Sequence, residues 1–249
     1  SGRTFRHDAY AGYKAHRAAM PDELRNQVVR IRQLIDALSI PLVEREGYEA
    51  DDVIGSLSCR CARDAGLHVL IVTGDTDLLQ LVDEHVEVIL PGARRFEDLR
   101  RYDKEAVKER YGFGHEYIPT YKALVGDTSD NIPGVPGIGE KTATALIQQF
   151  GHLEQILEHL DEVTPPRARE ALRANSQQAI ESKRLATIVC DLDIPCDLEH
   201  SAIDNYDRER VIALFRELEF RSLLNRLPEP RKAPAAARRE PPKTDRKTV

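Results

Sequence analysis

The sequence lacks three features that would each define a class of protein. No apolar run approaches the roughly 20 residues that a helix needs to cross a bilayer, which excludes a transmembrane helix. No charged-then-apolar segment opens the chain, so we do not expect secretion. Basic residues are not in excess either, because 36 Lys and Arg against 42 Asp and Glu give a formal net charge of −6. Any binding of nucleic acid must therefore use local features and not bulk charge.

Cysteine is also scarce. The four cysteines form neither a dense disulfide framework nor the paired C-x-x-C pattern of a zinc site; they are Cys59, Cys61, Cys190 and Cys196. We therefore expect reduced thiols in a cytoplasmic protein. The 249 residues allow one large domain or two small ones, and a hydrophobic fraction of 41% can supply a sizeable core.

The apolar pattern predicts an α/β part. Helical spacing predicts a helix over 21–39, with Pro21 in its first turn. The elements expected after it are a strand over 40–44, a helix over 49–65 ended by Gly66, a buried strand over 68–73, a short helix over 78–82 and a strand over 86–90. This alternation favours a parallel sheet with helices on its faces.

A helical part and a tail follow. The periodicity from residue 104 to residue 220 is helical almost throughout, so we expect an α/β core over 1–103 and a helical part over 104–227. The segment 228–249 holds five prolines, seven Lys or Arg and three Asp or Glu, with almost no large apolar side chains. Such a segment cannot bury enough surface to offset its ordering entropy, which predicts a disordered tail or linker.

Seven carboxylates fall in three clusters at the ends of the expected elements. Two clusters follow strands, and sites in open parallel sheets lie beyond the carboxyl ends of the strands. The third places its carboxylates at i and i+3, on one face of a helical turn. The residues are Glu49, Asp51 and Asp52, then Asp75 and Asp77, and finally Asp127 and Asp130.

Each cluster alone could be a helix cap or a turn. Together, however, seven carboxylates at one rim would repel one another unless a hard divalent cation with oxygen ligands neutralised them. Mg²⁺ or Mn²⁺ fits better than zinc, because no His or Cys lies inside the clusters. The corresponding chemistry uses two metal ions about 4 Å apart that clamp a phosphate.

The most specific string is Ile-Pro-Gly-Val-Pro-Gly-Ile-Gly-Glu-Lys-Thr-Ala, residues 132–143. It predicts a tight turn with exposed backbone amides, directly before a helix whose positive end suits a phosphate oxygen. Lys141 and Thr142 add a charge and a hydroxyl. A nucleotide P-loop is excluded, because Gly-x-x-x-x-Gly-Lys-Ser/Thr does not occur. The string predicts that this acidic chain holds a nucleic-acid backbone locally, without reading bases.

These strings resemble a known family. Glu-Ala-Asp-Asp-Val-Ile-Gly (49–55), Thr-Gly-Asp-Thr-Asp (73–77) and the run 126–143 are similar to the bacterial 5′→3′ exonuclease domain of DNA polymerase I. More broadly, they resemble the flap endonuclease superfamily, and Thr4-Phe5-Arg6 and the run 13–17 match it as well. The resemblance extends from about residue 3 to residue 227. It implies a PIN-like, parallel-sheet 5′ nuclease core followed by a helix–hairpin–helix part.

The resemblance also implies residue roles. The seven carboxylates would carry two Mg²⁺ or Mn²⁺ ions, and the hairpin would grip duplex phosphates and could hold a K⁺ on its carbonyls. Lys14 and Arg17 would face the scissile phosphate at the base of a helical gateway; an exposed basic helix face is the alternative. The residues expected to contact DNA are Arg6, Tyr13, Gly134, Gly137, Gly139, Lys141 and Thr142.

The implied function is that of a divalent-metal-dependent 5′→3′ exonuclease or 5′-flap endonuclease in replication and repair. Its substrate would be DNA with a 5′ flap, nick or RNA primer, and the protein would be a monomer at the bacterial nucleoid in the cytoplasm, with a fused polymerase as a further partner. Family members begin with a strand that carries a metal-binding Asp, and a second Asp precedes Thr-Phe-Arg. Because this chain starts after both, we expect a fragment or an incomplete site, with metal binding but little turnover.

Two other interpretations remain open. A non-catalytic module that binds DNA structures would use the hairpin while its metal site is incomplete; retention of all seven carboxylates weighs against it. A small-molecule phosphatase of the Asp-x-Asp type would leave the hairpin unexplained. The sequence does not distinguish exonuclease from flap preference, or RNA from DNA preference.

Overall fold

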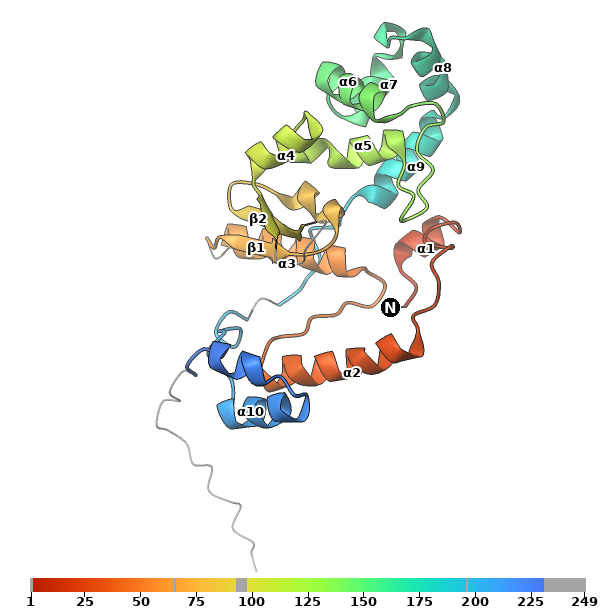
Figure 1. Cartoon of the computed structure of the whole chain (residues 1–249). Coiled ribbons are helices and arrows are strands. Elements are labelled where there is room, and N and C mark those ends of the chain that lie inside the picture. The colour runs from red at the N-terminus through yellow and green to blue at the C-terminus, as the bar shows by residue number, and fades with distance from the viewer. Residues whose placement is uncertain (1, 65, 93–97, 196, 231–249) are drawn as a thin grey trace, which may run out of the picture. The chain divides into compact units, whose positions relative to one another are not determined.

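The computed structural model describes residues 2–64, 66–92, 98–195 and 197–230 and divides the chain into two units (Figure 1). Unit 1 comprises residues 1–19 and 43–196, and unit 2 comprises residues 20–42 and 197–249. Among the described residues, no helix is long and apolar enough to span a membrane. The expected boundary at residue 103 stays a prediction. Most of the expected tail, from residue 231 onward, lies outside the described residues.

Unit 1 contains a mixed three-stranded sheet. The strands, in sheet order, are β1 (Val69–Val72), β2 (Val86–Pro91) and β3 (Leu99–Tyr102). β1 and β2 pair in parallel with Ile71 opposite Val88, whereas β2 and β3 pair antiparallel with Val88 opposite Tyr102. The strands expected over 68–73 and 86–90 are thus confirmed, and so is the α/β class.

Two sequence-based expectations about the sheet were wrong. Residues 40–44 form no strand; they are exposed coil, and Pro41 removes a backbone donor that a strand ladder would need. The antiparallel strand β3 was not expected, because it reads Leu-Arg-Arg-Tyr and buries only Tyr102. Its apolar pattern is therefore too short to predict a strand.

The α/β part of unit 1 also contains three helical segments: α1 (Phe5–Ala9), α3 (Ala50–Asp64) and the 3₁₀ helix η1 (Thr76–Leu81). α3 confirms the helix expected over 49–65, and its first turn holds Asp51 and Asp52. η1 takes the place of the short helix expected over 78–82. Asp75 caps it by accepting a hydrogen bond from the backbone N–H of Asp77 at 2.9 Å.

The rest of unit 1 is helical. Its elements are α4 (Lys104–Tyr111), η2 (His115–Tyr117), α5 (Ile118–Val125), α6 (Glu140–Phe150), α7 (Leu153–Glu158), η3 (Leu160–Glu162), α8 (Pro166–Ala174) and α9 (Ser176–Ala186). α5 packs against both α6 and α9 (Figure 1). One hydrophobic core runs from Val88 in the sheet through Leu124 in α5 to Leu146 in α6. Sheet and helices therefore share a core within unit 1.

Unit 2 is small and helical. It contains α2 (Asp22–Ala37), α10 (Arg208–Glu217) and η4 (Arg221–Arg226). Its core joins Ala37 to Val211 and Phe215, and Arg30 pairs with Glu217 at 2.8 Å. α2 confirms the first expected helix. The expectation of helix almost throughout 104–220 fails over 187–207, where the described residues form no helix.

Candidate metal centre and phosphate-binding hairpin

Asp52 is the only one of the seven carboxylates that is fully buried, and protein donors occupy both of its oxygens. Arg6 donates from Nη1 to Oδ2 at 2.7 Å and from Nη2 to Oδ1 at 2.8 Å. The backbone N–H groups of Glu49 and Val189 each donate to it at 3.0 Å. Burial raises the pKa of Asp52, but the hydrogen bonds from Arg6 and the backbone outweigh burial, and the net shift is downward. Asp52 is thus an ionised carboxylate saturated by donors.

Arg6 does not lie where the sequence-based expectation placed it. It was expected to contact DNA, yet it is 2% exposed. Besides Asp52, it donates to the carbonyl oxygens of Leu185 and Thr187 at 2.8 Å each. A fully desolvated guanidinium needs this complete set of acceptors. Arg6 therefore joins α1, α3 and the end of α9 and is not available to a ligand.

Three side chains of the segment 13–17 contact Glu49 or Asp130, and two of them contact both. The Tyr13 hydroxyl lies 2.9 Å from both Glu49 Oε2 and Asp130 Oδ2, and its single proton can be donated to only one of them at a time. Lys14 Nζ lies 2.8 Å from Glu49 Oε1 and 3.4 Å from Asp130 Oδ2. Arg17 Nη2 donates to Asp130 Oδ1 at 2.8 Å. Tyr13 and Lys14 thus bridge two carboxylates that are 81 positions apart in the chain, and Arg17 adds a second cation to Asp130.

The backbone at Lys14 is held in an unusual conformation. Its φ is +53°, in the left-handed region that costs an L-residue about 1–2 kcal/mol. The Lys14 N–H donates to the Asp130 carbonyl at 3.0 Å, which ties this turn to the segment that carries Asp130. The tertiary contact therefore offsets local strain and directs Lys14 toward the carboxylates.

Asp77 and Asp127 share one cation, Lys122. Its ammonium forms ion pairs with both carboxylates, and its side chain is only 13% exposed. Burial raises the pKa of Asp77 to about 6, with Asp75 and Asp127 adding to the rise against Lys122. Burial also acts to raise the pKa of Asp127, but Lys122 and Ser129 lower it to about 2. Burial thus dominates the pKa of Asp77, whereas Asp127 also receives the hydrogen bonds from Ser129, which do not reach Asp77.

Asp127 and Asp130 lie in a turn, not in the helical turn that was expected. Asp127 Oδ1 accepts the Ser129 N–H at 2.7 Å, and a bridge pairs Asp127 with Ile132 in antiparallel fashion. Asn131 has a φ of +58°, which an Asn tolerates better than most residues. The expectation failed because this side-chain-to-backbone bond competes with helix formation. The turn sends Asp127 to Lys122 and Asp130 to Lys14.

Asp51 and Asp75 have no ion pair among the described residues. Burial raises the pKa of Asp51 to about 6, and the next contributions come from the negative charges of Asp75 and Glu49. Such mutual repulsion requires the carboxylates of α3 and of the β1–η1 turn to lie near each other. α3 also packs directly against η1, so the tertiary structure brings the first two clusters together.

Six carboxylates make up what we call the carboxylate cluster: Glu49, Asp51, Asp75, Asp77, Asp127 and Asp130. Lys14, Arg17 and Lys122 pair with members of the cluster, and Arg6, the counter-ion of Asp52, lies 3.6 Å from Glu49 Oε2. The six carboxylates outnumber these four cations, so the cluster keeps an excess of negative charge. Within the described part of the chain, no three His, Cys, Asp or Glu side chains are placed to hold a metal ion as a group. The donor set nevertheless consists of carboxylate oxygens, the ligands that Mg²⁺ and Mn²⁺ prefer.

The sequence analysis did not identify Lys122 as a site residue, although its apolar surroundings on the helix were a signal. It lies on α5, whose other residues include the buried Ile118, Ala123 and Leu124. A lone cation on an otherwise apolar helix is costly to bury without a carboxylate partner. Asp127 follows Lys122 by only five residues and could have been recognised as one partner from the sequence. Asp77 is 45 positions away, so this second partner is recognised only in the folded structure.

The hairpin, residues 132–142, follows directly after this turn and ends in α6. Gly134 has a φ of +63°, and a Cβ there would lie 2.3 Å from the Gly126 nitrogen. Gly137 has a φ of +87°, while Gly139 caps α6 with ordinary dihedral angles; added Cβ atoms at both would meet open space. In the described structure, no hydrogen bond uses the N–H of Gly137 or Gly139. The hairpin thus presents free amides at a helix N-terminus.

Two further hairpin residues were expected to contact DNA. Lys141 is exposed and has no ion pair or hydrogen bond within the described ranges, whereas Thr142 is half-buried in the first turn of α6. Tyr13 was also expected to contact DNA, but its side chain is buried. Its hydroxyl lies within hydrogen-bonding distance of both Glu49 and Asp130. Burial and the two carboxylates raise its pKa, so the phenol remains a proton donor.

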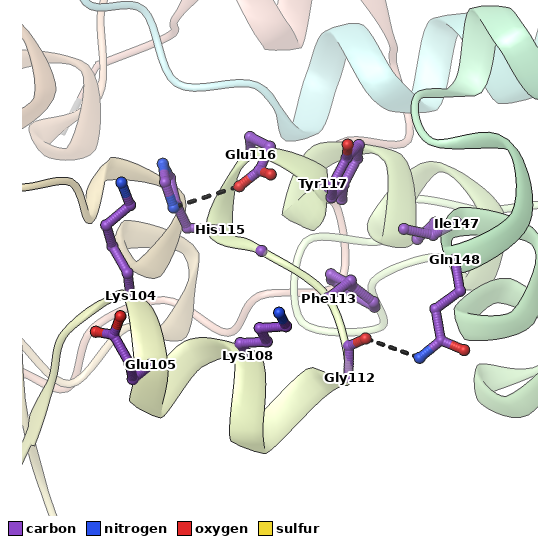
Figure 2. A pocket seen from close by; sticks show the side chains of 11 residues that line it. Lys104, Glu105, Lys108, Gly112, Phe113, His115, Glu116, Tyr117, Ile147 and Gln148 are labelled. Atoms are coloured by element: carbon purple, nitrogen blue, oxygen red, sulfur yellow. Dashed lines mark hydrogen bonds and ion pairs between the residues drawn. The ribbon is translucent and has the colours of Figure 1, made fainter.

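A separate pocket of ≈ 520 Å³ lies between α4, η2 and α6 (Figure 2). Gln148 at its edge donates to the Gly112 carbonyl at 2.7 Å. The acidic and basic side chains that line the pocket are those of Lys104, Lys108, Glu105 and Glu116. The charges of these two lysines and two glutamates cancel, and no member of the carboxylate cluster lines the pocket. It is therefore not part of the candidate site.

The fold and the site define the class: an α/β protein whose carboxylates gather beside a glycine hairpin. A family model described as 5'-3' exonuclease, N-terminal resolvase-like domain, matches residues 1–112. A second, described as 5'-3' exonuclease, C-terminal SAM fold, matches residues 114–209. The chain therefore belongs to the 5′–3′ exonuclease family, which confirms the resemblance seen in the sequence.

Curated relatives agree with this assignment. The chain is 49% identical over 243 residues to DNA polymerase I of Chloroflexus aurantiacus, covering 95% of this chain and 25% of that protein. It is 44% identical over 226 residues to DNA polymerase I of Bacillus subtilis, covering 91% of this chain and 26% of that protein. The chain thus spans about a quarter of the length of these relatives.

Solved structures share the fold. The T5 D15 protein co-crystallised with metal ions aligns with a TM-score of 0.63 at 21% identity, covering 88% of this chain and 80% of that chain. The catalytic core of Rad2 in complex with DNA substrate aligns with a TM-score of 0.53 at 13% identity, covering 92% of this chain and 76% of that chain. At such identities the likeness concerns the fold alone, and it agrees with the expected nuclease fold class.

Proposed function

We propose that this chain is the nuclease part of a 5′→3′ exonuclease or 5′-flap endonuclease that needs divalent metal ions. Its substrate would be DNA with a 5′ flap, a nick or an RNA primer, cleaved in the bacterial cytoplasm. The observation that carries the proposal is the carboxylate cluster, in which six acidic side chains meet four cations, one of them the Arg6 that already neutralises Asp52. The relatives are DNA polymerases I, so we further propose that a polymerase is fused to this part.

The carboxylate cluster fits two Mg²⁺ or Mn²⁺ ions by the chemistry of its donors. Asp51 and Asp75 are the first ligands that we propose, since they lie near each other without an ion pair. Asp77 and Asp127 become ligands when Lys122 moves aside, and Asp52 is excluded because Arg6 saturates it. Bound ions of this kind polarise phosphate oxygens and generate a hydroxide nucleophile near neutral pH.

Lys14 and Arg17 are the residues that we propose for the reacting phosphate. Both extend from one turn into the carboxylate cluster, and the Arg17 side chain is 54% exposed. A phosphate gains negative charge in the transition state, and fixed cations aimed at that charge lower the barrier. The carboxylates of Glu49 and Asp130 hold the two side chains in place before substrate arrives.

The hairpin is the proposed grip on the duplex. The free N–H groups of Gly137 and Gly139 and the exposed Lys141 suit phosphate oxygens and carry no base-reading side chain. A K⁺ on the hairpin carbonyls would add a further positive charge at this point. The contact then depends on backbone charge, so affinity falls as salt rises and does not depend on sequence.

A flap-cleavage assay tests this function. With Mg²⁺ or Mn²⁺, an extended chain that restores the two expected amino-terminal carboxylates should release the 5′ flap from a labelled duplex, whereas the given chain should bind metal with little turnover. In the extended chain, Asp75→Asn should remove the activity while duplex binding persists. Asp193→Asn is the matched control, because that carboxylate is 96% exposed and lies outside the carboxylate cluster. A melting scan of both variants with and without Mn²⁺ reports metal binding independently of turnover.

The second candidate is a module that binds DNA structures without cleaving them. Arg6 and Lys122 favour it, because they satisfy three of the seven carboxylates without metal. It predicts duplex binding with no Mn²⁺-induced rise in melting temperature and no cleavage. The absence of any Mn²⁺-induced shift in melting temperature, together with cleavage that survives Asp75→Asn, would overturn the proposal of a metal-dependent nuclease.

A further inference from the structure

The last turn of α9 and the coil after it, residues 185–189, are held by side chains of three other elements. We call these residues the linking segment. Arg6 of α1 donates to two of its carbonyl oxygens, and Asp52 of α3 accepts one of its N–H groups. The segment also lies close against α3, because a Cβ built on Gly55 would be 2.6 Å from the Ile188 side chain. The linking segment therefore connects α1 with α3.

Gln80 of η1 makes the third attachment with its side-chain amide. Its Nε2 donates to the Ala186 carbonyl at 3.1 Å, and its Oε1 accepts the Ile188 N–H at 2.9 Å. The amide thus pairs with the linking segment much as the backbone of a neighbouring strand would. Nε2 also donates to the Asp77 carbonyl at 3.0 Å. Since an amide nitrogen carries two hydrogens, Gln80 uses both of its donors.

This amide is a direct connection between a member of the carboxylate cluster and the segment that holds Asp52. The Asp77 carboxylate is paired with Lys122, which must move aside in the proposed function before a metal ion can bind. Once that ion pair is lost, the place of Asp77 depends on its backbone. The hydrogen bond from Gln80 keeps this backbone attached to the segment that also holds α3, the helix that carries Asp51.

We propose that Gln80 is a positioning residue, which holds Asp77 beside Asp51 so that the two carboxylates can share the metal site. The inference rests on the proposed function, because Asp77 and Asp51 are the ligands proposed there. Gln80 acts through the Asp77 backbone and does not touch the metal ion. Outer groups that orient a metal ligand typically contribute about ten- to a hundredfold in metal affinity.

A Mn²⁺ titration of the full chain tests the inference. Electron paramagnetic resonance of the free ion measures binding directly, so the result does not depend on folding stability. Gln80→Met has nearly the same size and removes all three hydrogen bonds. It should raise the dissociation constant for Mn²⁺ by about ten- to a hundredfold. Hydrogen exchange at the Ile188 amide should become faster in this variant, because the amide loses its acceptor.

Ser56→Ala is the matched control. The Ser56 hydroxyl donates to the Val189 carbonyl and accepts the Leu192 N–H, each at 3.1 Å, but neither bond reaches the carboxylate cluster. This variant should therefore lower stability in urea unfolding and leave the affinity for Mn²⁺ unchanged. A residue with a merely structural role would behave like Ser56, so the contrast between the two variants identifies positioning.

Gln80→Asn provides a second variant, because it keeps the amide but is one methylene too short to reach both partners. It should also weaken Mn²⁺ binding, and it decides the question if circular dichroism shows that Gln80→Met does not fold. Failure of both variants to fold would make Gln80 a structural residue and overturn the inference.

Two further outcomes separate this inference from the proposed function. Mn²⁺ binding that is equally tight in the unmodified chain and in the Gln80 variants would overturn the positioning role and leave the metal site standing. No Mn²⁺ binding by the unmodified chain would overturn the metal site itself, and the positioning role with it.

Discussion

The last member of the carboxylate cluster, Asp130, adjoins the hairpin in the chain, yet the cluster and the hairpin are held by different means. The hairpin is ten or so consecutive residues whose backbone presents its N–H groups, and its shape depends on glycine dihedral angles. The carboxylate cluster gathers side chains from three segments, and Lys14 and Lys122 hold them through long, rotatable arms. The hairpin is thus preformed by its backbone, whereas our proposed function requires the carboxylate cluster to exchange protein cations for metal ions.

The largest effect on stability is expected at Asp52. This carboxylate is paired with the buried Arg6 and is not a member of the carboxylate cluster. Asp52→Asn leaves the Arg6 charge buried without its counter-ion, and we expect a loss of about 3–5 kcal/mol in the free energy of unfolding. Urea unfolding measures it. Arg6→Met in the same background should recover part of the loss, whereas a cost as small as that of a surface substitution would return Asp52 to the metal ligands.

Lys14→Ala and Arg17→Ala come next. In a chain with the expected amino-terminal carboxylates restored, each should slow single-turnover cleavage at saturating DNA by about a hundred- to a thousandfold, because the lost cation would stabilise charge that develops on the phosphate. Fluorescence anisotropy should find duplex affinity nearly unchanged. Arg173→Ala, which removes an exposed arginine paired with Asp161, serves as the control. Variants that bind weakly but cleave normally when saturated would make these residues backbone-positioning groups only.

Within the hairpin, the glycines should separate stability from binding. Gly134→Ala drives a Cβ against the Gly126 backbone at a φ of +63° and should cost more than about 2 kcal/mol in the free energy of unfolding. Gly139→Val meets open space, so it should keep stability while weakening binding to duplexes of any sequence. Gly137→Val should weaken binding and also cost about 1–2 kcal/mol at its φ of +87°. Unchanged affinity in both valine variants would remove the hairpin from DNA binding.

The smallest expected effect distinguishes Asp51 from its neighbour Asp52. Because the folded-state pKa of Asp51 is raised to about 6 from 3.8, the folded protein binds this proton more tightly, and the group costs stability as pH rises through that window. Asp51→Asn should therefore raise the free energy of unfolding at pH 7 by up to about 2 kcal/mol in metal-free buffer, and change it little at pH 4. Urea unfolding at both pH values tests the sign. A destabilised variant at pH 7 would mean that Asp51 has an unrecognised cation partner.

Several elements followed from sequence because their signals are local. The strand 68–73, the helix 49–65 and the hairpin each combine periodicity with glycine or a cap, and the structure has an element at each place. β3 and the irregular run 187–207 did not follow, since few of their residues show a periodic apolar pattern. The carboxylates were found as candidates, but Asp52 could not be separated from Asp51 by any feature of its neighbours.

The sequence by itself determined the α/β character, the hairpin and the family, because backbone preference and periodicity depend on residues within a few positions of one another. Only the tertiary structure decided which cation meets which carboxylate. Arg6 reaches Asp52 across 46 positions, and Lys122 reaches Asp77 across 45. The physical reason is that the charge state and partner of a long side chain depend on its burial and on distances between segments, and neither quantity exists until the chain has folded.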